Sequence, residues 1–245
     1  MSFEGKTALI TGSGAVGGLG HATAKILAAG GARVIITGTD AQRGAEVVQD
    51  LLNDGGTARF VQADLSEVES IHRLADEAGA VDILVNNASL LPFSATADQD
   101  AESFDAATAV NVRAPFLLTA ALAPKMAANG GGSIVNVSST AAGIGMPGLA
   151  LYGATKSAVE SFTRATAAEF APSNVRVNAV SPGPTRTAKF VAMLGPDGGG
   201  IAETTALKRT AEPSEVAEVI AFLAGDRASI VTGAVVAADG GRSAI

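Results

Sequence analysis

The 245-residue chain contains no cysteine and no tryptophan, and it has only one tyrosine and two histidines. Without cysteine it can form no disulfide and no thiolate metal site, and it has no cysteine nucleophile. A reducing compartment suits such a chain, so we expect a cytoplasmic protein. His21 and His72 have no second imidazole or carboxylate at ligand spacing, which argues against a metal site.

Positive charge is also scarce, with 17 Lys and Arg against 24 Asp and Glu and a formal net charge of −7. Such a balance does not favour binding to a phosphate backbone, so nucleic acid is not an expected partner. The N-terminal residues lack the pattern of an export signal, and we find no apolar run long enough to span a bilayer. We therefore expect no membrane association.

Apolar residues are abundant, at 47% of the chain, and many of them occur in short β-branched runs. These runs are almost continuously apolar, which is typical of strands buried on both faces of a parallel sheet. Alanine-rich segments with helical spacing separate them. The alternation predicts an α/β protein with a Rossmann-type, doubly wound sheet of seven parallel strands and helices on both faces. The predicted strands are 7–11, 33–37, 58–62, 81–85, 133–137, 175–180 and 231–237, and the predicted helices are 20–29, 41–53, 66–79, 101–128 and 153–171.

No repeat, charge block or long linker divides the chain, so we expect a single domain over residues 1–245. The least regular region runs from Pro182 to about Pro213. Within it we predict a mobile substrate loop at about 184–212, although a plain surface insertion would have the same composition.

A glycine-rich segment, residues 11–20, lies between the first predicted strand and the first predicted helix. Its glycines permit a tight turn and a close approach of the backbone to a pyrophosphate, whose charge the helix N-terminus would attract. The position between strand and helix favours a dinucleotide site over a merely flexible turn.

The end of the second predicted strand bears on the choice of dinucleotide. Asp40 could accept a hydrogen bond from the 2′-hydroxyl of NAD, or it could be the N-cap of the next helix. The glycine-rich segment has no Lys or Arg, and the nearest downstream cation is Arg43. NAD and NADP therefore both remain open.

The lone tyrosine, Tyr152, is followed four residues later by Lys156, so the two side chains share one face of a helix. A phenol is a poor acid or base near neutrality unless its pKa falls, and a close cation in a poorly solvated site could lower it. Upstream, a strand delivers Ser138 and Ser139 to its carboxyl end. A serine hydroxyl there could donate to a developing oxyanion, or it could cap the next helix.

Several short motifs recur together in one known family. They are Thr11-Gly12 with Gly18-Leu19-Gly20, Ala63-Asp64-Leu65, Asn86-Asn87-Ala88, Asn111, Ser139, Tyr152 with Lys156, Ser181-Pro182-Gly183 and Asp239-Gly240-Gly241. In this order, across essentially the whole chain, they resemble the single-domain branch of the short-chain dehydrogenase/reductase family, near the 3-oxoacyl-carrier-protein reductases.

The resemblance implies a catalytic set and a cofactor, NAD or NADP, that supplies the hydride. Tyr152 would be the general acid and base, and Lys156 would lower its pKa and bind the nicotinamide ribose. Ser139 would orient the substrate carbonyl, and Asn111 would help to hold a proton-relay water. The residues that we expect at the cofactor are Gly12, Gly14, Gly18, Leu19, Gly20, Thr39, Asp40, Asp64, Leu65, Asn87, Ala88, Tyr152, Lys156, Pro182, Gly183, Thr185 and Thr187.

The chain departs from the family pattern at two points. Five residues separate Gly12 from Gly18 where the family usually has three, so either two residues are inserted or Gly14 takes the first glycine's role. Ser89 stands where the family commonly has glycine, which adds a side chain beside the cofactor.

We therefore predict an enzyme that moves a hydride between a nicotinamide cofactor and a ketone or secondary alcohol. The segments 90–98, 140–150 and 184–210 are mostly small or apolar, so the substrate should be small or apolar. The alternatives are a non-catalytic dinucleotide-binding sensor or scaffold, and an enoyl reductase, for which the family's spacing between tyrosine and lysine is usually longer. The family often forms tetramers, so we expect a homo-oligomer, most simply a homotetramer.

Overall fold

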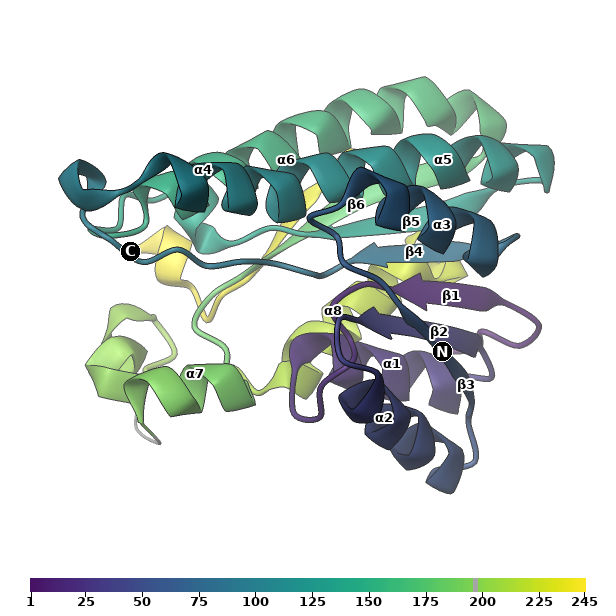
Figure 1. Cartoon of the computed structure of the whole chain (residues 1–245), viewed down its shortest axis with the longest axis horizontal. Helices are drawn as coiled ribbons and strands as arrows, with labels where there is room; N and C mark the ends of the chain where they lie inside the picture. The colour runs from purple at the N-terminus through teal and green to yellow at the C-terminus, as the bar shows by residue number, and fades with distance from the viewer. Residues whose placement is uncertain (196–197) are drawn as a thin grey trace.

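A single sheet of seven parallel strands forms the centre of the computed structural model, which describes residues 1–195 and 198–245 (Figure 1). The strand order β3-β2-β1-β4-β5-β6-β7 reverses direction between β1 and β4. In such sheets a ligand binds at the carboxyl ends of the strands beside this reversal. The strands are β1 (Thr7–Ile10), β2 (Arg33–Gly38), β3 (Thr57–Gln62), β4 (Ile83–Asn86), β5 (Gly132–Val137), β6 (Val175–Pro182) and β7 (Val235–Ala238).

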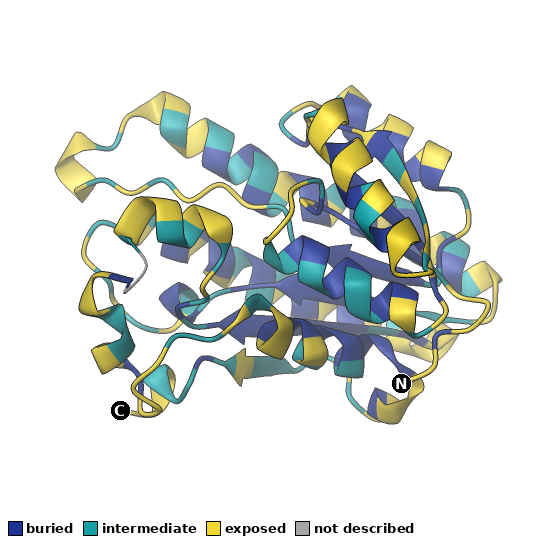
Figure 2. Ribbon diagram, turned by 90° about the horizontal axis from the view of Figure 1, so that it is seen from below, coloured by how far each residue is buried: buried dark blue, intermediate teal, exposed yellow. Residues whose placement is uncertain are grey.

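Helices cover both faces of this sheet, which confirms the doubly wound prediction (Figure 1). One face is covered by α1 (Leu19–Ala29), α2 (Ala41–Asn53) and α8 (Pro213–Ala224). The other is covered by α3 (Val68–Ala78), α4 (Ala101–Thr108), α5 (Ala114–Ala128) and α6 (Ala150–Phe170). Each face has its own buried apolar cluster. Figure 2 shows the usual result, with the strands and the inward sides of the helices buried and the outward sides exposed.

The last strand is shorter than the predicted run 231–237, because side chains replace the ladder at its start. The Asn178 side chain donates to the carbonyl of Val231 over 2.8 Å and accepts from the Ala234 N–H over 3.1 Å. Gly233 has a φ of 74°, which belongs to a turn rather than a strand. The chain therefore enters β7 only at Val235.

The predicted helix 101–128 is present but is not uniform. Its turn at Ala109–Arg113 is a π-helix between α4 and α5. Taken together, Ala101–Ala128 are long and apolar enough to cross a membrane by length and composition alone, so the prediction that no run reaches that length is wrong. Half of its most apolar window is buried within the protein, as expected of a helix in the core.

The region predicted to be least regular contains two short helical segments, α7 (Ala188–Leu194) and a 3-10 helix at Gly198–Thr204. The prediction of a mobile loop at about 184–212 includes residues 196 and 197, which lie outside the described residues. No helix was predicted at α8, where Pro213 occupies the first turn and Glu212 and Glu215 form a capping box.

Candidate active site

The glycine-rich turn brings the backbones of β1, α1 and β4 into close contact. Gly12 has a φ of 63°, and a Cβ there would lie 2.6 Å from the Cα of Ala88. A Cβ on Gly20 would lie 2.7 Å from Nδ2 of Asn87 and 2.8 Å from the carbonyl oxygen of Gly12. Gly18 is the N-cap of α1, with no side chain capping the helix. The first N–H groups of α1 are thus available to an anion.

These contacts decide how the turn accommodates its two additional residues. Gly12 has the positive φ and the close backbone approach that only glycine permits, which favours it as the first glycine; the role of Gly14 stays a prediction. Ser13 is buried; its hydroxyl donates to the carbonyl of Ile10 over 2.6 Å and accepts from the Thr37 N–H over 3.1 Å. The Gly14 N–H donates to the Thr37 carbonyl over 3.2 Å, so the insertion is tied to the end of β2.

The segment after β4 is held against the same turn. The Thr11 hydroxyl accepts from the N–H groups of Asn87 and Ala88, each over 3.0 Å. The Asn87 side chain in turn donates to the carbonyls of Thr11 and Gly12, over 2.8 and 3.1 Å. Asn87 and Ala88 therefore lie directly beside the glycine turn, as the prediction requires.

A cavity of about 480 Å³ lies beyond the ends of β2 and β3, and its walls include the predicted residues Thr39 and Asp64. Hydrogen bonds from the Ser66 hydroxyl and N–H hold the pKa of the Asp64 carboxyl below its ordinary value. Leu65 is buried next to it. The size and position of this cavity suit the adenosine end of a dinucleotide.

Asp40 is the N-cap of α2, which confirms the structural interpretation of this residue. Its carboxylate accepts from the Arg43 N–H over 3.0 Å and from Nε of Arg43 over 3.1 Å. Both contacts lower the pKa of the carboxyl, the backbone one more strongly. These contacts account for Asp40 within α2, and they leave the choice between NAD and NADP open.

The end of β5 separates the two neighbouring serines. Ser138 is buried, and its hydroxyl donates to Oε1 of Glu160 over 2.7 Å. The Ser139 hydroxyl accepts from the Ala141 N–H over 3.2 Å. Glu160 therefore occupies the Ser138 hydroxyl, and the role of Ser139 toward the substrate carbonyl stays a prediction.

Tyr152 lies in the first turn of α6, one helical turn before Lys156. Burial raises the pKa of the phenol, while interactions with the hydroxyls of Ser89 and Ser139 act in the opposite direction. The Lys156 Nζ lies 5.6 Å from the centre of the phenol ring and donates to the carbonyl of Val137 over 2.8 Å. Burial lowers the pKa of Lys156 to about 8. A lowering of the Tyr152 pKa by Lys156 stays a prediction.

Asn111 lies in the π-helical turn, and its side chain is fully engaged. Its Oδ1 accepts from the Leu90 N–H over 2.8 Å and from the Ser89 hydroxyl over 3.2 Å. Its Nδ2 donates to the Leu90 carbonyl over 2.8 Å and to the Thr155 hydroxyl over 3.0 Å. The side chain thus joins the segment after β4 to α6, and the predicted contact with a relay water stays a prediction.

The remaining predicted residues follow β6 at the same edge of the sheet. Pro182 ends the strand, and a Cβ on Gly183 would lie 2.7 Å from the Cα of Asp239, so only glycine fits there. The Thr185 hydroxyl donates to the Gly183 carbonyl over 3.0 Å. The Thr187 hydroxyl caps α7 by accepting from the Phe190 N–H over 3.1 Å.

A nicotinamide dinucleotide fits these residues. The turn around Gly12 and Gly20 leaves no room for side chains, the start of α1 offers free N–H groups, and a cavity adjoins the ends of β2 and β3. Among residues 1–195 and 198–245, no three His, Cys, Asp or Glu side chains are grouped closely enough to hold a metal ion. His21 instead lies 2.8 Å from a carboxylate oxygen of Asp50.

Ser89 was predicted only as a departure from the family pattern, without a role of its own. Its hydroxyl donates to Oδ1 of Asn111 over 3.2 Å and lies 3.4 Å from the carbonyl oxygen of Leu90. The unusual residue at this position was the signal that could have identified it.

Comparison with known proteins places most of the chain in one group. A family model described as "Enoyl-(Acyl carrier protein) reductase" matches residues 14–243. The cyclopentanol dehydrogenase of Comamonas sp. is 37% identical, over 98% of this chain and 97% of that protein.

Solved structures are similar over the same extent. A short chain dehydrogenase/reductase family protein is 49% identical, with a TM-score of 0.93 and complete coverage of both chains. A 3-oxoacyl (acyl-carrier-protein) reductase from Agrobacterium tumefaciens C58, solved with NADP bound, is 31% identical with a TM-score of 0.92. That match covers 98% of this chain and 95% of the other.

Proposed function

Since the chain belongs to the short-chain dehydrogenase/reductase family, we propose that Tyr152, Lys156 and Ser139 carry out its chemistry. The protein is an oxidoreductase that uses NAD or NADP and moves a hydride between the nicotinamide and an alcohol or carbonyl group. The observation that carries the assignment is the position of the Tyr152 phenol, which has the Lys156 ammonium over its ring, 5.6 Å from the ring centre.

The cofactor would be held by the elements at the carboxyl edge of the sheet. The start of α1 would bind the pyrophosphate, Asp64 and Leu65 would contact the adenine, and Lys156 would donate to the nicotinamide ribose. When bound, the nicotinamide supplies or accepts the hydride.

The proton of the reaction would pass through Tyr152. In alcohol oxidation the phenolate accepts the hydroxyl proton while the substrate carbon gives up its hydride, and carbonyl reduction runs in reverse. Ser139 donates to the substrate oxygen, on which negative charge develops. Lys156 has a pKa of about 8, so most of it is charged at pH 7, where it favours the phenolate by Coulomb attraction.

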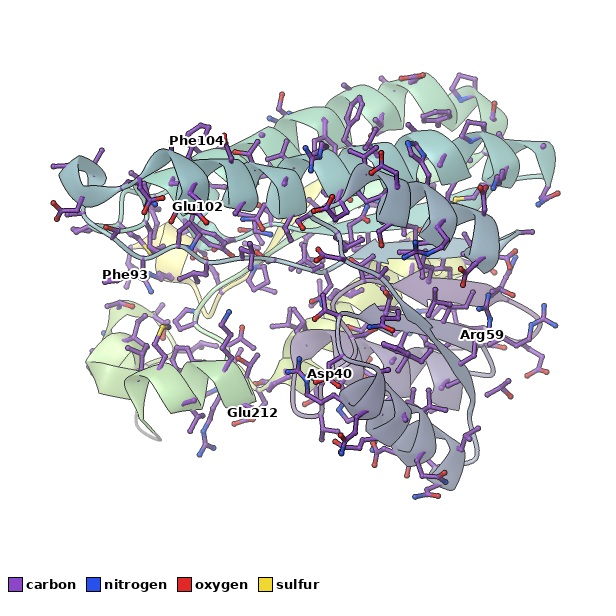
Figure 3. The ribbon with its side chains drawn as sticks, in the orientation of Figure 1. Asp40, Arg59, Phe93, Glu102, Phe104 and Glu212 are labelled. Atoms are coloured by element: carbon purple, nitrogen blue, oxygen red, sulfur yellow. The ribbon has the colours of Figure 1, made fainter. Side chains whose placement is uncertain are left out.

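The side chains near the site support a small or apolar substrate. Leu90, Leu91 and Phe93 are exposed on the segment after β4, and Figure 3 shows Phe93 between that segment and α7. Met193 and Leu194 are exposed on α7. Such surfaces favour an aliphatic or alicyclic secondary alcohol or its ketone, in keeping with the name of the cyclopentanol dehydrogenase relative.

The first test is turnover of cyclopentanol with NAD⁺ and NADP⁺ by the wild type and by Tyr152→Phe. The variant keeps the ring but loses the proton-carrying hydroxyl, so we expect turnover to fall by at least about 100-fold while dinucleotide affinity is retained. Full activity in the variant would refute the assignment, because the chain has no other tyrosine. Dinucleotide binding without turnover of any alcohol or ketone in a broad panel would instead indicate a sensor or scaffold.

An enoyl reductase is the second candidate, supported by the description of the matching family model. Crotonyl and acetoacetyl thioesters, assayed side by side with NADH and NADPH, separate reduction of a carbon–carbon double bond from reduction of a carbonyl. We expect the acetoacetyl thioester to be the better of the two.

We also propose that the protein is a homotetramer. The outer surface of α4, α5 and α6 supports this assignment, because Phe104 and Phe116 are about half exposed there, at 52% and 50%. Phe116 packs edge-to-face on Phe162, with ring centres 6.1 Å apart. Exposed aromatic clusters of this kind commonly mark protein interfaces.

A further inference from the structure

Both ring nitrogens of His21, a buried residue in the first turn of α1, have hydrogen-bond partners. Its Nδ1 accepts from the backbone N–H of Gly17 over 3.3 Å, and its Nε2 lies 2.8 Å from Oδ2 of Asp50 on α2. A backbone N–H can only donate and a carboxylate can only accept. The imidazole in this arrangement is therefore neutral and carries its proton on Nε2.

Gly17 is held from a second side as well. Its carbonyl accepts from the N–H of Ala188, the first residue of α7, over 3.3 Å. Gly17 has a φ of 77° and directly precedes Gly18, the N-cap of α1. The orientation of Gly17 therefore sets the path by which the chain enters a helix whose first N–H groups are available to an anion.

The contact with His21 is the second anchor of the lengthened glycine turn. At the first anchor, Ser13 and Gly14 are tied to the end of β2. Ala15 and Val16, between the two anchors, are exposed. A glycine-rich backbone loses much conformational freedom when it becomes ordered. An anchor that is already formed in the free protein therefore favours binding of a ligand at the turn.

The charged groups around His21 belong to α1 and to α2 with the residue that ends it. The Asp50 carboxylate accepts from Nζ of Lys25 over 3.2 Å, and Lys25 also pairs with Asp54 over 2.7 Å. Hydrogen bonds from His21 and Lys25 lower the pKa of the Asp50 carboxyl, so it stays ionised near neutrality. Of these groups, only the imidazole is of a type that changes charge between about pH 5 and 8.

We propose that neutral His21 is a positioning residue of dinucleotide binding, which holds the glycine turn in its binding conformation by accepting from the Gly17 N–H. This inference rests on the binding of NAD or NADP at the glycine turn, which is part of the proposed function. A proton on Nδ1 sets two N–H groups against each other, so the Gly17 peptide must turn away. Dinucleotide binding therefore favours the neutral imidazole and releases the proton of any His21 that was charged in the free protein.

Three substitutions separate the two contacts of the ring from the general effect of losing a histidine. His21→Asn places an amide oxygen where Nδ1 accepts, but it does not reach Asp50 and does not titrate. His21→Gln places an amide nitrogen near the position of Nε2 and leaves the Gly17 N–H without its acceptor. His72→Asn is the matched control, because His72 is the only other histidine and is exposed on α3.

Calorimetric titration with NAD⁺ and NADP⁺, in buffers of different ionisation heat, measures both the affinity and the protons exchanged on binding. We expect the wild type and His72→Asn to release protons, and their affinity to rise by up to about tenfold from pH 5 to 8. His21→Asn should keep the wild-type affinity of the upper end of this range at every pH. His21→Gln should bind about tenfold more weakly than the wild type there. Protons exchanged by the dinucleotide itself, such as those of the NADP⁺ 2′-phosphate, cancel in the comparison with His21→Asn.

Equal proton exchange in the wild type and His21→Asn would overturn the inference. Proton uptake by the wild type would also overturn it, because it would mean that the imidazolium attracts the pyrophosphate. Circular dichroism shows whether each variant is folded, and His21→Gln, which does not titrate either, replaces His21→Asn in the proton comparison if that variant is not. The titration needs no substrate, so a wild type that binds a dinucleotide without turnover would refute the proposed chemistry while proton release still decides the role of His21.

Discussion

A buried ammonium is costly to the folded protein, and Lys156 is 2% exposed with a pKa of about 8. Its pKa is lower in the folded protein than in the unfolded chain, where it is 10.5. Between pH 8 and 10.5 the unfolded chain therefore binds more protons, and the stability of the wild type should rise with pH.

Lys156→Met tests this linkage. Loss of the ionisable group should remove the rise in the free energy of unfolding between pH 8 and 10.5, which amounts to about 3 kcal/mol. It should also reduce turnover severely. Urea unfolding from pH 7 to 10.5 measures the difference, with both proteins compared in a Tyr152→Phe background so that the phenol does not titrate. Parallel stability curves would show that the amine is not shielded from water as described.

At the scale of single residues, the sequence was informative where chemistry and spacing coincide. The four-residue interval between Tyr152 and Lys156 could be predicted to place both on one helical face, as it does. Ser139 was chosen over Ser138 only by resemblance, because the contact that occupies Ser138 comes from Glu160 on another element. The contact between Ser89 and Asn111 could not be predicted, since it depends on how the segment after β4 meets the π-helical turn in three dimensions.

At the scale of elements, glycine positions report how closely backbones approach. A Cβ on Gly20 would lie 2.8 Å from both the carbonyl oxygen of Gly12 and the Cα of Ser13. Gly20→Ala must therefore move α1 away from the glycine turn, and we expect at least about a tenfold loss of dinucleotide affinity, measured by calorimetry. The control is Gly145→Ala, whose Cβ would meet no heavy atom within 4 Å; equal losses in both variants would contradict the prediction.

Element boundaries followed from local sequence only where local contacts determine them. The strands β1 to β6 were predicted within a few residues. Five of them are mostly buried and therefore almost continuously apolar, whereas the edge strand β3 is largely exposed and only Val61 in it is buried. The start of β7 depends on the side chain of Asn178, which lies far away in the chain. The helix α8 did carry a local signal, a proline in its first turn and a buried stripe at Val216, Ala217, Ile220 and Ala221.

At the scale of the whole molecule, the reversal of strand order explains why distant motifs form one site. The turn after β1 and the segment after β4 are neighbours because β1 pairs with both β2 and β4. The ends of β5 and β6 continue the same edge, and they bring Ser139 and Gly183 to it. The resemblance supplied the roles of these residues, while the parallel topology accounts for their proximity.

The proposed tetramer follows from the surface rather than from the sheet. Phe116 is exposed on α5 and rests against Phe162 of α6, and Figure 3 shows Phe104 on α4 in the same layer of helices. Phe116→Ser removes one ring of the aromatic pair from the surface of these helices. Association of subunits through this surface should therefore weaken by at least about tenfold. The molar mass from light scattering, measured over a dilution series, should then fall below that of the wild type.

Phe93→Ser is the control, because Phe93 is 70% exposed but lies beside the proposed substrate site. A wild type that is monomeric at all concentrations, or a Phe116→Ser variant with unchanged mass, would exclude this layer as the subunit interface.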